Sequence, residues 1–330
     1  MPDPQKLPNF FIVGAPKAGT TSLYNYLDQH PSIFMSPLKE PNHFAAEVRP
    51  ENFAPQMQPQ IQREMQTLRE YLDGPMQQKR FSGIVSQWDD YIRLFTNAAT
   101  HHTAIGEASV AYLWSKSAAK NIAARIPSAK ILIVLRNPID RAFSQYLHNL
   151  SEGVVGHSFR THLQNALSRT TDEFSAAHPF LELGLYADQF QRFRDHFPAT
   201  QIRLWLYEDT RSPQFLPEVL NFLQVDPTFT PDTSKKHLEA HTPRSLRLSH
   251  SLHKSGLWTT LRAATPPAIR KRIHSLIYRK QGTLQLQQPE REILTNYYRP
   301  DILKLQTLLQ RDLSPWLQST TSVPDQTPPH

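Results

Sequence analysis

The chain has 330 residues, of which 39% are hydrophobic and 20% charged, a balance that excludes a disordered protein and provides a folded core. It contains no cysteine, which excludes disulfides, thiolate chemistry and cysteine-bound zinc. The formal net charge of +7 favours anionic partners, such as a phosphorylated nucleotide, an acidic polysaccharide or a membrane surface.

The first predicted elements are a strand, a tight loop and a helix. Residues 9–13 are apolar and β-prone, and they run into the glycine-containing segment 14–21. From Thr20 onward, Leu23 and Leu27 are four residues apart and lie on one face of a predicted helix, which ends before Pro31. This order is typical of a phosphate-binding loop between a strand and a helix.

A second unit of the same kind begins at Lys130. Residues 131–135 are continuously apolar, as expected for a central parallel strand covered on both faces. The strand ends at Arg136, and Pro138 suits the first turn of a helix. The apolar face of that helix is marked by Phe143, Leu147 and Leu150.

Three further strands are predicted, at residues 202–207, 33–35 and 104–106. Strands that alternate with helices favour an α/β fold, a doubly wound central parallel sheet flanked by helices. Ligands of such sheets bind outside the carboxyl ends of the strands. Both the loop after residue 13 and the turn at Arg136 lie at such ends.

We expect residues 1–317 to form one domain. Residues 48–87 are rich in Pro, Gln and Met, which predicts an insertion of loops and short helices near an acceptor cleft. The segment after Thr230 is basic and predicted to be helical, with a break at Pro266 and the proline that follows it. Residues 318–330 form a polar tail that we expect to be disordered.

The first loop has the outline of a Walker A motif, with Gly14 and Gly19 at the usual separation. Thr20 occupies the position of the Walker lysine, and the lysine is found three residues earlier, at Lys17. A Walker lysine reaches the β and γ phosphates of a nucleoside triphosphate, so the displacement weakens an ATPase interpretation. Anion binding at the helix terminus is still expected.

Residues 16–23, Pro-Lys-Ala-Gly-Thr-Thr-Ser-Leu, resemble the 5′-phosphosulfate loop of sulfotransferases that use 3′-phosphoadenosine 5′-phosphosulfate (PAPS). Residues 133–146 resemble the 3′-phosphate site of the same family, in which an arginine ends a strand and a serine follows eight residues later. The resemblance implies a P-loop-like sulfotransferase fold. It assigns PAPS binding to Lys17, Ala18, Gly19, Thr20, Thr21, Ser22, Arg136 and Ser144. Arg141 lies on another face of the predicted helix from Ser144, and a salt bridge explains it as well as phosphate binding does.

A third segment, residues 39–44 (Lys-Glu-Pro-Asn-His-Phe), resembles the corresponding segment of one branch of this family. That branch comprises the glycosaminoglycan-modifying enzymes and bacterial sulfotransferases. There the glutamate is the general base, a role that carries over to Glu40. The spacing departs slightly and Ala45 stands where a second phenylalanine is common, so His43 stays an alternative base. A surface carboxylate paired with Lys39 is the structural alternative for Glu40.

Two further resemblances are weaker. Residues 105–112 are similar to a family segment that usually reads Gly-Glu-Lys-Ser/Thr-Pro-x-Tyr, but the lysine and the proline are missing here. Glu107 is expected either near the acceptor pocket or in an internal hydrogen bond. The family's late basic loop has possible counterparts in Lys235, Lys236 and Arg244, of which Arg244 is the chosen candidate, and a solvated basic face explains them equally well.

The resemblance implies transfer of a sulfuryl group from PAPS, the co-substrate, to an acceptor hydroxyl or amine, with a carbohydrate or glycolipid favoured. No metal is expected, since Lys17 and the helix terminus can offset the charge of the leaving group. A kinase with a degenerate P-loop and a non-catalytic protein that binds nucleotides or polyanions are the alternatives. Nucleic acid is not expected as a partner, because the Lys and Arg residues are scattered.

The apolar run at residues 10–13 is far shorter than the roughly 20 residues of a membrane-spanning helix. We therefore expect a cytoplasmic protein without a signal peptide or anchor. The sequence leaves open the acceptor, O- or N-sulfation and the oligomeric state.

Overall fold

The computed structural model describes residues 6–234, 241–243, 278–280 and 284–318. The chain divides into two compact units, which are described separately. The first unit consists of Met1–Asn137, Glu173–Ser175 and Leu185–His237, and the second of Pro138–Asp172, Ala176–Gly184 and Leu238–His330.

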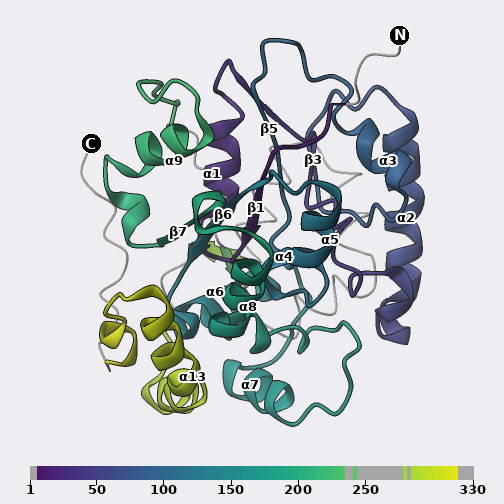
Figure 1. Ribbon diagram of the computed structural model, residues 1–330. Coiled ribbons are helices and arrows are strands. Elements are labelled where there is room, and N and C mark those ends of the chain that lie inside the picture. The colour runs from purple at the N-terminus through teal and green to yellow at the C-terminus, as the bar shows by residue number, and fades with distance from the viewer. Residues whose placement is uncertain (1–5, 235–240, 244–277, 281–283, 319–330) are drawn as a thin grey trace. The chain divides into compact units, whose positions relative to one another are not determined.

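The first unit is built on a parallel sheet of five strands in the order β2-β5-β1-β6-β7 (Figure 1). The strands are β2 (Ile33–Met35), β5 (Ala104–Ala108), β1 (Phe10–Gly14), β6 (Lys130–Leu135) and β7 (Ile202–Leu206). All residues of β1 and β5 are buried, because helices cover a parallel sheet on both faces. A separate parallel pair joins β3 (Leu38–Lys39) to β4 (Arg80–Phe81).

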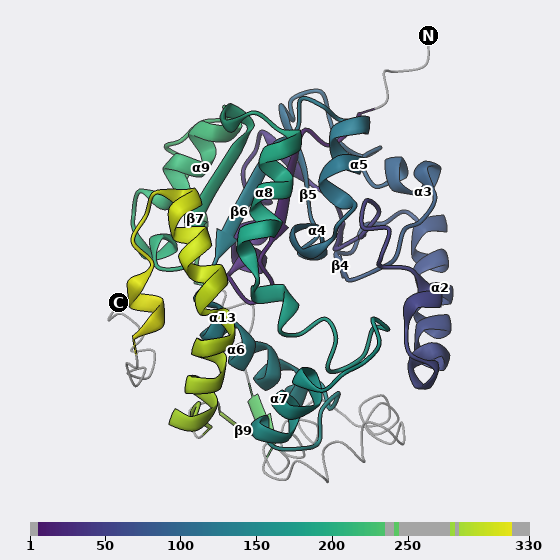
Figure 2. The same cartoon turned by 60° about the horizontal axis from the view of Figure 1, so that its bottom comes forward.

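The helices of the first unit lie on both faces of this sheet. Figure 2 shows α4, α5 and α8 together on one face. Along the sheet, the connection from β1 to β2 runs toward one edge and the connection from β5 to β6 runs toward the other edge. Because both crossovers are right-handed, α1 lies on the face opposite to α4 and α5. The helices are α1 (Thr20–Leu27), α2 (Gln58–Asp73), α3 (Trp88–Arg93), α4 (Ala111–Trp114), α5 (Ala118–Arg125), α8 (Tyr186–His196) and α9 (Phe215–Leu223).

The second unit is mainly helical. Its described α-helices are α6 (Pro138–Ser151), α7 (Phe159–Leu167) and α13 (Gln288–Leu309), and its described strands are the antiparallel pair β8 (His241–Pro243) and β9 (Tyr278–Lys280). Arg291 of α13 forms an ion pair of 2.9 Å with Asp140 of α6. Tyr298 donates a hydrogen bond of 2.9 Å to the carbonyl of Leu181, so α13 is fixed against two other segments of this unit.

These elements confirm the predicted α/β fold and its strands. Pro138 begins α6, and Leu147 and Leu150 are buried on its apolar face, whereas Phe143 is only half-buried. The prediction of loops and short helices over residues 48–87 holds for two 3-10 helices, Pro50–Asn52 and Pro55–Met57, and is wrong for Gln58–Asp73, which form the 16-residue helix α2. Its buried face is narrow, being made of Ile61, Leu68 and Leu72, which is why polar residues dominate the sequence there. The placement of this insertion near an acceptor cleft stays a prediction.

Candidate active site

The loop between β1 and α1 requires its two glycines. Gly14 has a φ of 154°, and a Cβ atom there would lie 2.7 Å from Cβ of Leu113. Gly19, which precedes α1, has a φ of 87° in the left-handed region. The Ala15 amide donates a hydrogen bond of 2.6 Å to Val134 of β6. The loop is therefore a tight turn fixed to the carboxyl end of the sheet.

The start of α1 suits a phosphate group. The first amides of a helix have no partner within the helix, and its N-terminus carries a partial positive charge. The first turn of α1 contains no acidic residue, and its hydroxyl-bearing residues are Thr20, Thr21 and Ser22. A phosphate placed here would meet amides and hydroxyls and no competing carboxylate from that turn.

Arg136 lies beside this loop in the first unit. Its Nη1 atom donates a hydrogen bond of 3.2 Å to the Lys17 carbonyl, and Lys17 itself has a φ of 65°. The Arg136 guanidinium also lies 4.9 Å from the ring centroid of Tyr207, which follows β7. A Cβ atom on Gly19 would contact the same tyrosine ring at 3.4 Å. Two predicted anion-binding elements, the loop and Arg136, are thus brought together.

The other predicted donor-site residues are distributed differently. Ser144 is in α6 of the second unit, so a shared phosphate site with Arg136 stays a prediction. Arg141 is fully buried and donates a hydrogen bond of 2.6 Å to the carbonyl of Phe180, which makes it part of the core of that unit. Arg244, Lys235 and Lys236 lie outside the described residues.

Glu40 lies in a turn that follows β3. It has a φ of 63°, in the left-handed region, and its amide donates a hydrogen bond of 2.8 Å to the carbonyl of Ala108 at the end of β5. Its Oε1 atom lies 2.5 Å from Nζ of Lys39. The Lys39 side chain is 3% exposed and that of Glu40 is 28% exposed, so the carboxylate is the part of this ion pair that reaches solvent.

His43 is packed into an aromatic cluster. Its Nδ1 atom lies 2.8 Å from the carbonyl of Val85, and its ring stacks on Tyr91 with centroids 4.5 Å apart. Burial lowers the pKa of His43, and the Arg49 charge acts in the same direction while the Val85 hydrogen bond opposes both. A neutral histidine could accept a proton, but these contacts give it an evident packing role, and its catalytic role stays an alternative.

Glu107 makes the internal hydrogen bonds that were one of its two expected roles. It is fully buried in β5 and accepts hydrogen bonds of 2.8 Å from the hydroxyls of Tyr91, Tyr112 and Ser109. Burial raises the pKa of Glu107 to about 7, although the three hydroxyls lower it, and the charge of Glu40 raises it further. Glu107 is therefore electrostatically coupled to the predicted base.

Sequence reasoning missed three contributions to this site: burial of Lys39, the two hydroxyls that α3 and α4 bring to Glu107, and the approach of Tyr207 to the loop. For Tyr91 the sequence signal is the aromatic spacing around it, which predicts a buried helix face and says nothing of its hydroxyl. The segment 105–112 contains Glu107 and Tyr112 but does not indicate a hydrogen bond between them.

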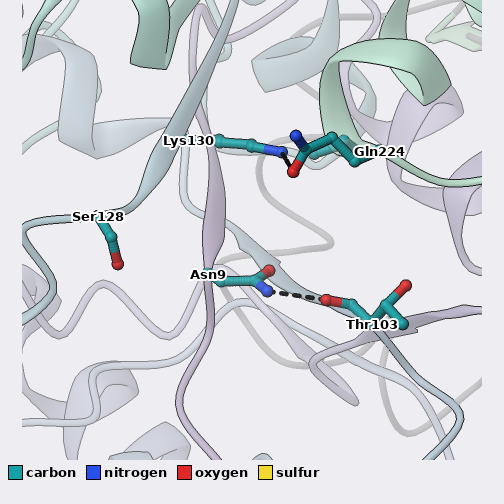
Figure 3. Close-up of a pocket in the computed structure, with 6 residues that line it drawn as sticks. Asn9, Thr103, Ser128, Lys130 and Gln224 are labelled. Atoms are coloured by element: carbon teal, nitrogen blue, oxygen red, sulfur yellow. Dashed lines mark hydrogen bonds between the residues drawn. The ribbon is translucent and has the colours of Figure 1, made fainter.

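A polar cavity of about 270 Å³ lies elsewhere in the first unit, at the amino ends of the strands (Figure 3). Asn9, before β1, donates a hydrogen bond of 2.9 Å to the carbonyl of Thr103, before β5, and Lys130 at the start of β6 donates one of 2.8 Å to Gln224. The first bond joins the starts of β1 and β5, and the second joins the start of β6 to the end of α9, at the opposite end of the sheet from the glycine loop.

The part of the chain that the structure describes contains no group of three or more His, Asp or Glu residues arranged to hold a metal ion. Within the same residues, no helix is both long enough and apolar enough to cross a membrane.

The model of the sulfotransferase family matches residues 8–209, which include the glycine loop, Glu40, Glu107 and Arg136. The chain belongs to the sulfotransferase family. A solved structure, a sulfotransferase from Alicyclobacillus acidocaldarius, is 30% identical with a TM-score of 0.66, and the match covers 95% of this chain and 100% of that one. The α/β arrangement described above is therefore the P-loop-like sulfotransferase fold.

Two curated relatives of this chain are longer proteins. The bifunctional heparan sulfate N-deacetylase/N-sulfotransferase 2 of Mus musculus is 27% identical over 227 residues, which are 67% of this chain and 22% of the relative. The bifunctional heparan sulfate N-deacetylase/N-sulfotransferase 3 of Homo sapiens is 26% identical over 324 residues, 95% of this chain and 31% of the relative. The chain thus matches less than a third of the length of either.

Proposed function

We propose that this sulfotransferase transfers a sulfuryl group from PAPS to a hydroxyl or amine of a carbohydrate or glycolipid acceptor. The observation that carries the donor assignment is the meeting of the glycine loop with Arg136, whose guanidinium contacts the Lys17 carbonyl. A carbohydrate acceptor is supported by the relatives, whose names include heparan sulfate and, for a rat protein that is 28% identical over 181 residues, carbohydrate sulfotransferase 15.

The residues fit the two ends of the donor. The loop and the first turn of α1 would hold the 5′-phosphosulfate, because they offer amides, hydroxyls and Lys17 without a carboxylate in that turn. Arg136 would bind the 3′-phosphate, since a guanidinium can make two parallel hydrogen bonds to one phosphate. Ser144 stays the second residue that the sequence predicts for this phosphate.

The reaction then needs alignment and charge neutralisation. The acceptor oxygen or nitrogen would attack the sulfur in line, a bond from the acceptor to sulfur would form, and the bond from sulfur to the bridging oxygen would break. Lys17 would offset the charge that develops on the leaving adenosine 3′,5′-bisphosphate. Glu40, partly exposed beside the end of β5, would take the acceptor's proton.

Calorimetric titration in EDTA tests this assignment. We expect adenosine 3′,5′-bisphosphate to bind the wild type at least tenfold more tightly than adenosine 5′-monophosphate or ATP, and Arg136→Ala to remove most of this preference. Arg203→Ala, which removes an arginine of β7 that stacks on Phe222, is the matched control and should bind normally. Equal binding of ATP, a requirement for metal, or normal binding by Arg136→Ala would refute the proposal.

We also propose that the protein acts in the cytoplasm, the location expected from the sequence. Fractionation of cells that express the full chain tests this, and recovery of the protein outside the soluble cytoplasmic fraction would contradict it.

A further inference from the structure

The turn that carries Glu40 is held in an unfavourable backbone conformation. Glu40 has a φ of 63° and Asn42 a φ of 54°, on either side of Pro41. A residue other than glycine in the left-handed region costs about 1–3 kcal/mol and persists only where the surroundings impose it. The contacts of residues 40–44 must therefore stabilise this backbone conformation.

Two hydroxyls connect the Glu107 carboxylate to the backbone of this segment. Ser109 donates to Oε2 of Glu107 at 2.8 Å and accepts a hydrogen bond of 3.2 Å from the amide of Asn42. Tyr112 donates to Oε1 at 2.8 Å and accepts a longer hydrogen bond of 3.4 Å from the amide of Phe44. A hydroxyl that donates to a carboxylate becomes a better acceptor, so the buried charge strengthens both backbone contacts.

A third connection runs from Glu107 to His43, which lies between Asn42 and Phe44. Tyr91 of α3 donates a hydrogen bond of 2.8 Å to Oε1 of Glu107, and its ring stacks on the His43 ring at an interplanar angle of 19°. One buried carboxylate thus contacts three successive residues, 42–44, through three hydroxyl-bearing side chains. These three donors occupy most of the roughly four lone-pair sites of the carboxylate, and each donor side chain also contacts the segment 42–44.

We propose that Glu107 is a positioning residue for proton transfer, which holds residues 42–44 through Ser109, Tyr112 and Tyr91 and thereby fixes the turn that presents Glu40. This inference rests on the proposed function in one respect, the assignment of Glu40 as the base. The effect on the backbone of the turn does not depend on that assignment.

The ionised form of Glu107 is the one that holds the turn. All three hydroxyls donate to the carboxylate, so a proton added to it would oppose one of them. The ionisable groups around it are Tyr91, Tyr112 and Glu40, with Lys39 paired to Glu40 and His43 behind the Tyr91 ring. Because the pKa of Glu107 is raised to about 7, the turn should loosen as the pH falls through 7.

The experiment compares the full-length wild type with Glu107→Gln, Tyr91→Phe and the control Glu47→Gln. Glu47 is the control because it also accepts hydrogen bonds from two serine hydroxyls, those of Ser115 and Ser117, at 2.5 and 2.9 Å. Through Ser117 it reaches the amide of Ala46, which lies just outside the measured residues. The first measurement is hydrogen exchange of the peptide amides at residues 40–45, followed by mass spectrometry. The second is formation of adenosine 3′,5′-bisphosphate from PAPS, with water as the acceptor, as a function of pH.

We expect exchange at residues 40–45 to rise at least tenfold in Glu107→Gln and less in Tyr91→Phe, with no change in Glu47→Gln. The kcat of Glu107→Gln should fall tenfold to a hundredfold, with KM for PAPS and affinity for the bisphosphate within threefold of wild type. The fall in wild-type kcat below pH 7 should move to lower pH in this variant. If Glu107→Gln does not fold, Tyr91→Phe decides the question by the same measurements.

The outcomes separate the two proposals. A wild type that neither binds the bisphosphate nor consumes PAPS would refute the proposed function, while hydrogen exchange would still report on the turn. Unchanged exchange in both test variants, or an unchanged kcat and pH profile in an active enzyme, would overturn the role of Glu107. Equal losses in kcat and in bisphosphate affinity would also overturn it, because they would indicate general damage to the site.

Discussion

His162 of α7 makes the second unit sensitive to acid. Its side chain is 1% exposed, and neither ring nitrogen has a hydrogen-bond partner among the described residues. Its ring lies against Phe180, with centroids 4.4 Å apart, and burial together with the His157 charge lowers the pKa of His162 to about 4. We expect His162→Phe, a ring of similar size without nitrogen atoms, to stabilise the protein and to reduce its loss of stability in acid.

The magnitude follows from the difference in proton binding between the two states. An unfolded histidine has a pKa of about 6.5, so protons bind the unfolded chain before the folded one, and the folded state loses stability as the pH falls from about 6.5 to 4. A difference of about 2.5 pKa units at about 1.4 kcal/mol each gives roughly 3 kcal/mol. The contribution of neutral His162 is fully present above pH 6.5.

Urea unfolding at pH values from 7.5 to 4, followed by circular dichroism, measures this effect as the difference between His162→Phe and the wild type. The advantage of the variant should grow by roughly 3 kcal/mol over this range. Leu163→Met, a volume-conserving change in the same helix, should differ from the wild type by a similar amount at every pH. A constant difference between His162→Phe and the wild type would refute the reasoning.

Two further predictions concern the active site. Gly14→Ala should lower the free energy of unfolding by about 2 kcal/mol or more and abolish binding of adenosine 3′,5′-bisphosphate, because Gly14 has a left-handed φ and an added Cβ would meet Leu113. The control Gly74→Ala, at a φ of −88°, should change neither stability nor binding. Normal binding by Gly14→Ala in calorimetry would contradict this. Glu40→Gln should lower kcat by about 10²- to 10⁴-fold, because the amide cannot take the acceptor's proton. Bisphosphate affinity should be unchanged, since the amide oxygen can still bind Lys39. A variant that turns over PAPS at the wild-type rate would exclude Glu40 as the base.

Local signals predicted the framework well. The apolar run that became β6 and the glycine loop before α1 are each specified by neighbouring residues, so their structure could be read without knowing the rest of the chain. The parallel sheet followed from the alternation of strands and helices. Helix α2 was misjudged because few of its residues are buried, which leaves a weak apolar period.

The candidate site was predicted only in part. The residues of the glycine loop and Arg136 were identified from the sequence, and the order of the strands places them side by side. The surroundings of Glu40 could not be predicted, because its turn is fixed by β5 and by residues 83–85, which are distant in the chain. No local pattern predicts a left-handed φ at a glutamate.

The sequence by itself determined where the strands, the helices and the anion-binding loop form, because hydrophobic periodicity, glycine and proline act over a few residues. Only the tertiary structure decided that Tyr91, sixteen positions before Glu107 and on a different element, would donate its hydroxyl to that carboxylate. Burial then raises the pKa of Glu107, since removing a charge from water is a property of the packed core, and its hydroxyl partners connect it to residues 42–44.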